Sequence, residues 1–453
     1  MAEAAAEVTH RRVLRIAVPV VLSNVTIPLL GIVDTGVVGQ MGQAAPIAAV
    51  GLGAVIITSL YWFFGFLRMG TTGLAGQALG AGDGREADAV LIRALMIGVG
   101  AGVLLMLLQA PLLWLGLALA PASAEVEEMA TAYLRIRIYG APAAIAIYGV
   151  TGWLIAQERT TAVLVLQLWM NGLNIALDLW FVLGLGWGVE GVALATFLAE
   201  WSGLALALMF CGGVLKRGVW RSRAALFDPE KLARLLAVST DITIRSVLLM
   251  AAFTSFLFLG ARFGDVTLAS NQVLLQFIYL ASYGLDGFAY AVEALVAQTL
   301  GARRRAALRR SVVICAQWCA VIAVGVTGAY AVFGGAIIDL MTTAPDVREV
   351  ARVYLPWVVV MPVLSAGSFL MDGVFIGATR TRDMRNMMIL SFAAYAGCAA
   401  VLVPLLENHG LWAAVAVFFV VRFVTLLARY PRVEADAMPP AEVLLAKGSG
   451  GSR

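Results

Sequence analysis

The sequence predicts an all-α polytopic membrane protein with twelve transmembrane helices, arranged as two six-helix lobes. The first observation behind this prediction is composition: of 453 residues, 61% are hydrophobic and 13% are charged, whereas soluble domains are nearer one half apolar. The second is distribution, because the apolar residues fall in runs of roughly 20–30, and about 20 suffice for a helix to cross about 30 Å of hydrocarbon. The third is an internal repeat of six such runs.

Twelve apolar runs separated by short polar loops predict the spans, and the longer runs predict tilt or extension beyond the membrane. In chain order, the predicted spans are 16–41, 47–79, 88–119, 127–156, 160–186, 190–214, 232–262, 266–300, 308–340, 348–378, 385–406 and 410–430. The predicted domains are an N-terminal lobe at 1–214, a cytoplasmic inter-lobe loop at 215–231, a C-terminal lobe at 232–430 and a cytoplasmic tail at 431–453.

The distribution of Lys and Arg predicts the orientation of the chain. Of 32 such residues, 23 fall in the termini and alternate loops on one side, six fall within spans, and three (Arg262, Arg348 and Arg352) fall on the other side. Cytoplasmic loops carry the excess of positive charge, so both termini are expected in the cytoplasm of a bacterial-type plasma (inner) membrane. The asymmetry also supports an even number of spans.

Shifting the chain by 221 residues superposes its two halves. The segment QALGA at 77–81 falls on QTLGA at 298–302, and Gly152, Ile155, Arg159 and Thr160 fall on Gly373, Ile376, Arg380 and Thr381. Two matches at one offset indicate duplication. Each copy has six spans, an even number, so the copies share one orientation. We therefore expect a pseudo-twofold axis along the membrane normal, with a cavity between two bundles.

Asp34 is the one ionisable residue in the first span, 16–41, and a charged carboxylate at that depth is costly. Counting 1.5 Å per helical residue places Asp34, Asp178 and Thr196 about 10–14 Å below the outer ends of their helices. Asn174 lies one turn before Asp178 on the same face. A buried carboxylic acid is much cheaper neutral than charged, so we expect the two aspartates to carry and share protons. Neither acid recurs at the shifted position, which confines this cluster to the N-terminal lobe.

Pro19 lies fifteen residues before Asp34 in the same predicted helix. An interior proline removes a backbone hydrogen bond and permits a kink. We expect protonation of Asp34 or Asp178 to rearrange the cluster and bend the first helix near Pro19, which changes the cavity. An ordinary kink without a role in transport is the alternative interpretation.

Further charged residues fall within the predicted spans, where they either pair to lower the cost of burial or line the cavity. The candidates for lining the cavity are Arg68, Asp286, Glu293 and Asp372. A structural role is favoured for Glu200 and for Asp241 with Arg245, an i,i+4 pair. Arg137 is expected near the membrane edge or paired to acids of the fourth span.

No motif indicates a cofactor, a dedicated metal site or an enzyme. The two histidines lie in loops, and the four cysteines lie in apolar runs, where they are expected to pack as small apolar side chains. The motifs HExxH and GxxxxGK[ST] are absent, which argues against a metalloprotease and against ATP as energy source. Two intramembrane aspartates are also compatible with an aspartyl protease, whose activity would survive collapse of the ion gradient.

Four long segments resemble the multidrug and toxic compound extrusion (MATE) transporters, in particular their DinF-like branch. These segments are VDTGVVGQMG at 33–42, FLRMGTTGLAGQALGA at 66–81, YGLDGFAYAVEALVAQTLGAR at 283–303 and MDGVFIGATRTRDMRN at 371–386. The resemblance spans essentially the full chain. It implies two six-helix lobes that open alternately to each side of the membrane, with export driven by an inward proton or sodium gradient.

The resemblance also implies roles for particular residues. Those implicated in coupling within this branch match Asp34, Asn174, Asp178, Thr196 and Pro19. The same four polar residues are the implied ligands if the coupling ion is Na+. The sodium-coupled branch typically uses a glutamate on the seventh helix, and this chain has Asp241 and no glutamate there. Asp372 matches a family acid on the tenth helix.

The predicted function is therefore secondary active efflux, in which H+ enters as a lipophilic, often cationic, small molecule leaves. Na+ coupling and flipping of lipids or other amphiphiles are the alternatives, and an acidic rather than basic cluster favours cations and protons. We expect small-molecule substrates and membrane lipids as partners, and no nucleic acid. A monomer is expected because two fused lobes suffice for one transport path.

Overall fold

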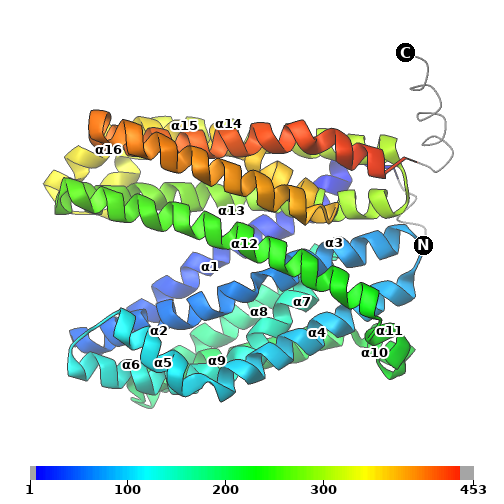
Figure 1. Ribbon diagram of the computed structural model, residues 1–453. Coiled ribbons are helices and arrows are strands. Elements are labelled where there is room, and N and C mark those ends of the chain that lie inside the picture. The colour runs from blue at the N-terminus through cyan, green and yellow to red at the C-terminus, as the bar shows by residue number, and fades with distance from the viewer. Residues whose placement is uncertain (1–6, 439–453) are drawn as a thin grey trace. The chain divides into compact units, whose positions relative to one another are not determined.

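The computed structural model describes residues 7–438, apart from the side chains of residues 27–30, 32, 35 and 215. Helices and the turns between them make up this range, and no β-strand occurs within it (Figure 1). Helices suit a membrane because each satisfies its own backbone N–H and C=O groups. The all-α prediction is confirmed.

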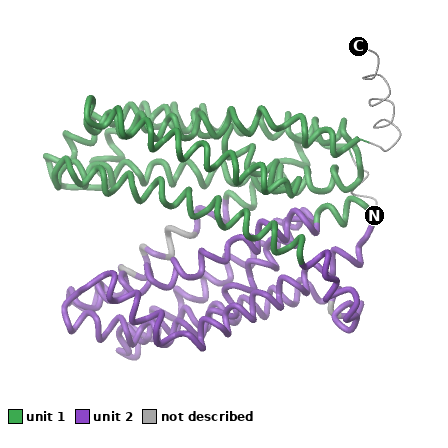
Figure 2. Tube along the Cα trace, viewed as in Figure 1, with its two compact units in different colours: residues 1–21, 76–82, 233–453 green, residues 22–75, 83–232 purple. Residues whose placement is uncertain are grey.

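The helices form two compact units (Figure 2). Unit 1 contains residues 1–21, 76–82 and 233–453, and unit 2 contains residues 22–75 and 83–232. The division near residue 232 lies close to the predicted start of the C-terminal lobe. Two segments of the N-terminal half nevertheless belong to unit 1, namely the start of the first helix and the end of the third.

Unit 2 contains the candidate site. Its main helices are α1 (His10–Gly39) from residue 22 onward, α2 (Ala44–Trp62), α3 (Phe66–Gly80) up to residue 75, α4 (Gly84–Leu107), α5 (Gln109–Leu119), α6 (Ala124–Arg137), α7 (Ala141–Ala156), α8 (Thr160–Asp178) and α9 (Gly188–Phe210), followed by the short α10 (Gly212–Arg217) and α11 (Arg223–Leu226). Within this unit α4 packs on α7, α8 on α9 and α2 on α6. Short 3₁₀ turns at Phe63–Gly65 and Ile138–Gly140 join α2 to α3 and α6 to α7.

Unit 1 contains the longest helices. They are α12 (Pro229–Gly260, from residue 233), α13 (Asp265–Gly301), α14 (Arg305–Met341), α15 (Pro345–Gly377) and α16 (Thr381–Asp436). α13 packs against α14 and α15, and α15 also packs against α14 and α16. α16 consists of two helices that meet at a kink at Glu407, whose φ of 51° and ψ of −129° are not helical. The predicted spans 385–406 and 410–430 lie on either side of this residue.

Nine helical segments among the described residues are long and apolar enough to cross a membrane. One of them, Thr381–Asp436, holds the two spans that meet at Glu407. α13 and α1 are not among these nine segments. α13 is long enough to span a membrane but more polar along its length, and α1 includes residues whose side chains are not described. Each predicted span therefore coincides with one helix or with consecutive helices of the structure.

The predicted span 88–119 is not one helix, because α4 ends at Leu107 and α5 begins at Gln109. Leu108 between them has φ −92° and ψ 11°, outside the helical region. Pro111 explains the break: a proline lacks the N–H that would bond to the carbonyl four residues earlier, at Leu107, and its ring clashes with that carbonyl. The continuous apolar character of the run concealed this break in the sequence.

The backbone confirms the internal repeat. Three positions with φ between 51° and 80° in the first half recur 221 residues later, in the pairs Gly82 and Arg303, Glu158 and Thr379, and Gly186 and Glu407. A left-handed residue commonly ends a helix by turning the chain away from its last turn. Residues other than glycine seldom adopt this conformation, so its recurrence at one offset indicates a repeated fold rather than chance similarity of two apolar halves.

Four residues of the repeat contact one another reciprocally within unit 1. Gly80 packs against the backbone of Gln298, and Gly301 packs against the backbone of Gln77, with no room for a Cβ at either glycine. The offset of 221 relates the two glycines to each other and the two glutamines to each other. Each contact is therefore the copy of the other, as across a twofold axis.

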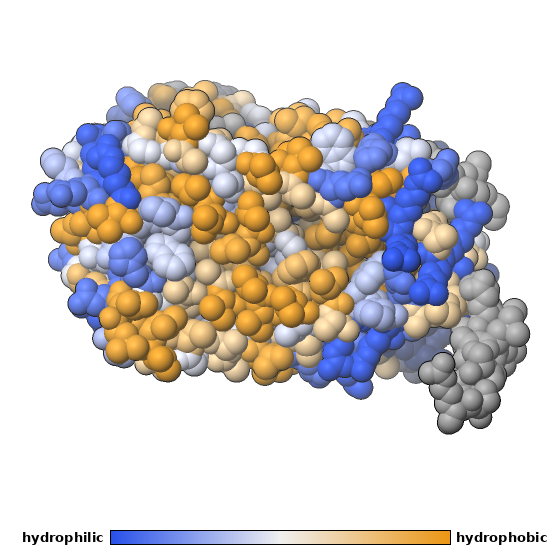
Figure 3. Space-filling model, turned by 90° about the horizontal axis from the view of Figure 1, so that it is seen from above, coloured by the Kyte–Doolittle hydropathy of each residue, from blue (hydrophilic) through white to orange (hydrophobic). Residues whose placement is uncertain are grey.

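Apolar side chains cover the middle of the face shown in Figure 3, and hydrophilic residues gather toward its two ends. Along α14, for example, Val321, Val324, Val332 and Phe333 are exposed. Soluble proteins rarely expose extended apolar patches, whereas helices that face lipid do. This surface agrees with the prediction of a polytopic membrane protein.

Candidate functional site

The four polar residues predicted to form a cluster come together in unit 2. Asp34 is on α1, Asn174 and Asp178 are on α8, and Thr196 is on α9. Asn174 and Asp178 share one face of α8 because four residues separate them, and α8 packs against α9. Their exposed fractions are 1% and 0%. The predicted proximity of these residues is therefore a feature of the structure.

Asn174 bridges the two acids and the threonine. Its amide orientation follows from the donors and acceptors around it. With its nitrogen toward the acids, it donates to Asp178 Oδ2 and to Asp34 Oδ1, at 3.2 Å each. Its oxygen then accepts from the backbone N–H of Thr196 at 3.2 Å and lies 3.1 Å from the Thr196 hydroxyl. A shift of either acid therefore changes the hydrogen bonds of the amide.

One oxygen of each acid lies 3.2 Å from the same Asn174 amide nitrogen, so the carboxyl groups of Asp34 and Asp178 are neighbours. An ionised carboxylate only accepts hydrogen bonds, so two neighbouring carboxyl groups can bond to each other only when one of them carries a proton. Two adjacent carboxylates resist being ionised together. The pair is therefore able to hold one proton between its two acids and to separate when that proton leaves.

The backbone geometry changes immediately after Asp178. α8 ends at this residue and continues as a π-helical turn, Leu179–Gly184, before α9 begins at Gly188. π-Helical turns are rare and frequently occur at functional sites. Asp178 is therefore the last α-helical residue before the π-helical turn that connects α8 to α9.

A buried ion pair that the sequence patterns did not indicate adjoins the cluster. Arg137, the last residue of α6, places Nη1 2.8 Å from Glu200 Oε2 on α9, and the two side chains are 7% and 9% exposed. Arg137 also acts electrostatically on Asp34 and Asp178. The prediction that Arg137 lies near the membrane edge or pairs with acids of the fourth span is wrong. Its partner lies on another helix, so no local spacing could reveal the pair.

Two tyrosines and a glycine complete the surroundings of Arg137. The Tyr61 hydroxyl donates to the Arg137 carbonyl oxygen at 2.9 Å, and its ring centre lies 6.0 Å from the guanidinium carbon, within reach of a cation–π contact. Tyr133, four residues before Arg137 on α6, is buried and interacts electrostatically with it. Gly140 leaves room for the Glu200 carboxylate, since a Cβ at that position would overlap Oε2.

Asp372, a predicted cavity-lining residue, is held between two arginines in unit 1. It pairs with Arg245 and with Arg422, and all three side chains are buried. Asp286 interacts electrostatically with Arg422. Of the remaining two candidates, Glu293 is 1% exposed in unit 1 and Arg68 is 8% exposed in unit 2. Charge pairing therefore explains the position of Asp372 directly.

The predicted i,i+4 pair of Asp241 with Arg245 is wrong. Asp241 accepts from Arg385 at 2.6 Å and from the Thr381 hydroxyl at 3.0 Å, whereas Arg245 pairs with Asp372. Asp241 pairs with residues of α16 and Arg245 with a residue of α15, because both side chains are buried against those helices. There, a bond to a neighbouring helix satisfies the charge better than a contact along the helix surface.

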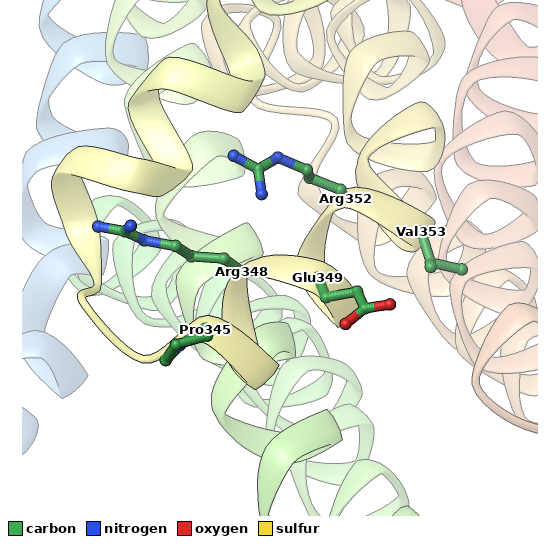
Figure 4. Close-up of a pocket in the computed structure, with 5 residues that line it drawn as sticks. All are labelled: Pro345, Arg348, Glu349, Arg352 and Val353. Atoms are coloured by element: carbon green, nitrogen blue, oxygen red, sulfur yellow. The ribbon is translucent and has the colours of Figure 1, made fainter.

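Two cavities differ in character from the acidic cluster. One, of about 580 Å³ in unit 2, is apolar apart from Ser59 and is lined from α2, the following turn, α4 and α5 by residues that include Val55, Ile56, Phe63, Phe64, Leu105 and Leu112. The other, of about 660 Å³, opens at the start of α15, where Arg348 and Arg352 extend from the helix (Figure 4). Both of these arginines are already paired with Asp339.

Comparison with known proteins identifies the family. The chain matches the family model described as MatE over residues 19–180 and 242–405. It is 38% identical to DNA damage-inducible protein F of Escherichia coli, over 92% of this chain and 91% of that protein.

Solved structures show the same fold. A multidrug resistance MATE family transporter of the MOP superfamily, in an outward-facing conformation, superposes with a TM-score of 0.83 at 21% identity, covering 94% of this chain and 96% of that one. A MATE protein in the bent conformation superposes with a TM-score of 0.82 at 21% identity, covering 94% and 95%. The chain therefore belongs to the MatE family, the multidrug and toxic compound extrusion transporters, and resembles its DinF-like members.

Proposed function

We propose that this protein is a proton-coupled antiporter that exports lipophilic, often cationic, small molecules across a bacterial inner membrane. The observation that carries the proposal is the adjacency of Asp34 and Asp178, each of which places one carboxylate oxygen 3.2 Å from the buried Asn174 amide nitrogen, because adjacent carboxylates favour a shared proton. Membership of a transporter family supplies the context. A relative of the same fold is named as a multidrug resistance transporter, which supports this substrate class.

The proposed cycle uses the proton to select between two arrangements of the cluster. With the proton bound, Asp34 and Asp178 stay together and Asn174 bridges them. When the proton leaves, the two carboxylates repel each other, and the bonds of Asn174 to Asp34 and to Thr196 on α9 are strained. Movement of α1 relative to α8 and α9 then changes access to the substrate.

Pro19 is the proposed hinge of this movement. α1 runs from His10 to Gly39 through Pro19 without interruption, although a proline leaves one carbonyl of the preceding turn without its N–H partner. Bending at such a position breaks no additional hydrogen bond. A protein of the same fold has been solved in a bent conformation, which supports bending as the conformational step.

The ion gradient is sufficient to drive export. One proton crossing 100 mV supplies about 2.3 kcal/mol, and each pH unit supplies about 1.4 kcal/mol. Together, about 3.7 kcal/mol supports a several-hundred-fold substrate gradient. The apolar cavity in unit 2, with its phenylalanines Phe63 and Phe64, suits a lipophilic substrate, since aromatic faces also attract organic cations.

Na+ coupling at the same residues is the second candidate. The side chains of Asp34, Asn174, Asp178 and Thr196 supply oxygen atoms from three helices to one place, and hard cations prefer oxygen ligands. A sodium ion would replace the proton between the two carboxylates and neutralise them in the same way. The two ions thus use one site and exclude each other.

The test uses proteoliposomes loaded with a pH-sensitive dye and an organic cation such as ethidium under an imposed pH gradient. We expect substrate-dependent proton flux without sodium, lost in Asp34→Asn and Asp178→Asn. Asp88→Asn is the matched control, because Asp88 is also buried in unit 2 but pairs with Arg217. Flux that requires sodium selects Na+ coupling. If neither ion moves with substrate, efflux of that compound is refuted, and lipid flipping is tested next.

We further propose that the protein works as a monomer with both termini in the cytoplasm, in accord with the 23 basic residues predicted on that side. Accessibility of an epitope added at each terminus, in sealed right-side-out and inverted vesicles, tests the orientation. Labelling of either terminus from the outside contradicts it.

A further inference from the structure

Arg137 pairs with Glu200 at 2.8 Å and also interacts electrostatically with Asp34 and Asp178. The titratable groups that act on its guanidinium come from five helices: Asp34 on α1, Tyr61 on α2, Tyr133 on α6, Asp178 on α8 and Glu200 on α9. A single guanidinium can neutralise only one of these three acids at a time. The acids therefore compete for it.

The charges of this group depend on one another. The guanidinium stays protonated, so the three carboxyl groups and Arg137 are neutral as a set when two of the three acids hold a proton. Each further proton lost leaves one uncompensated negative charge in a buried site, which is costly in a membrane protein. A proton shared by Asp34 and Asp178 is one of these, and its loss creates a demand for a nearby cation.

The atoms that would pair Arg137 with Asp178 are available for a new bond. Among the described residues, Arg137 Nε and Asp178 Oδ1 are buried without a hydrogen-bond partner. Arg137 Nη1 and Glu200 Oε2 are 2.8 Å apart, yet neither makes a well-directed hydrogen bond. Proximity of charge rather than ideal bonding therefore holds Arg137 to Glu200, and strong ion pairs need well-directed bonds.

We propose that Arg137 is the positioning residue of the coupling site: its guanidinium pairs with Glu200 while Asp34 and Asp178 share a proton, and it turns to Asp178 when that proton passes to water. Glu200 is the competing anion that sets how readily the exchange occurs. The inference rests on the proposed function in one respect, that Asp34 and Asp178 are the proton-carrying pair.

The exchange predicts opposite effects of neutralising its two members. Glu200→Gln releases the guanidinium to Asp178, favours the deprotonated pair and moves the half-titration of the pair to lower pH. Arg137→Gln removes the cation that stabilises the deprotonated pair and moves the half-titration to higher pH. A nearby charge displaces the titration of a carboxyl group by about 1–3 pH units, so each variant is expected to move it by about one unit or more.

The measurement is an infrared titration of protonated carboxyl groups in the full-length protein in liposomes, with Asp178→Asn used to assign the band. The double variant Arg137→Gln/Glu200→Gln removes both members of the ion pair together and provides the reference if one single variant fails to fold; its midpoint is expected between those of the single variants. Asp88→Asn, which breaks another buried pair of unit 2, is expected to leave the midpoint unchanged.

Shifts of the same sign in the two single variants, or shifts no larger than that of Asp88→Asn, overturn the inference. The titration needs no transport, so it is independent of the test of the proposed function. Opposite shifts without substrate-linked proton flux would retain the role of Arg137 and reject proton-coupled efflux. Proton flux without opposite shifts would do the reverse.

Discussion

Asp34 and Asp178 lie on helices far apart in the sequence, α1 and α8, and each places one carboxylate oxygen 3.2 Å from the amide nitrogen of Asn174. Two carboxylates so close repel each other unless a proton lies between them. Binding or loss of a proton therefore changes contacts among three helices at once.

Asn174→Ala is expected to weaken proton-coupled transport about tenfold or more. It removes a donor shared by Asp34 and the fully buried Asp178, and an unsatisfied buried group costs about 1–3 kcal/mol. Asn171→Ala is the matched control, because Asn171 is also buried on α8 but donates to Thr26. The measurement compares the transport rates of the two variants in proteoliposomes, normalised to the amount of folded protein. Equal losses in the two variants would show that the bridge to the acids has no special role.

Two glycines of α4 predict opposite outcomes two residues apart. A Cβ at Gly102 would lie 2.3 Å from the backbone of Pro142 on α7, whereas nothing lies within 4 Å of a Cβ at Gly100. Gly102→Ala is expected to lower the melting temperature because it forces α4 and α7 apart. Gly100→Ala is expected to leave it unchanged or raise it, since alanine favours helices by about 1 kcal/mol. Thermal unfolding in detergent measures both, and a stable Gly102→Ala protein would contradict the close packing of these helices.

Asp372→Asn is expected to destabilise the protein rather than uncouple it. Removing this carboxylate leaves Arg245 and Arg422 buried without their shared anion, and breaking a buried pair costs about 3–5 kcal/mol. Asp339→Asn serves as the comparison, because Asp339 is 40% exposed while pairing with two arginines, and exposed pairs contribute about 1 kcal/mol or less. A fully stable Asp372→Asn protein that no longer couples transport to the ion would instead place Asp372 in the coupling site.

Pro19→Ala is expected to lower the transport rate while substrate binding is retained. Alanine restores the backbone hydrogen bond and stiffens α1, so bending becomes harder. Pro356→Ala is the control, because this proline also lies inside a helix, α15 of unit 1. Binding by fluorescence and transport by dye efflux separate the two steps. An unchanged rate in Pro19→Ala would reduce Pro19 to an ordinary kink.

Periodicity and charge predicted the helices and the repeat, because a membrane imposes these patterns locally. Each span must be apolar over the thickness of the bilayer, and duplication preserves turn positions such as Glu158 and Thr379, both of which have positive φ. Proline chemistry could also have predicted the break before Pro111. The acidic cluster was predictable because Asp34 and Asp178 are rare charges at similar depth in their helices.

Partners across helices depended on tertiary packing. The sequence placed Arg137, Glu200, Arg245 and Asp372 in spans but could not pair them, since spacing along one helix says nothing of its neighbours. The close approach of α6 to α9 brings Arg137 to Glu200, and the packing of α12 near α15 and α16 brings Arg245 to Asp372 instead of to Asp241. The sequence by itself determined which charges fall within the spans, because each span is an apolar run of fixed length along the chain. The tertiary structure decided which charges neutralise each other, because in a low-dielectric interior the nearest opposite charge is the partner.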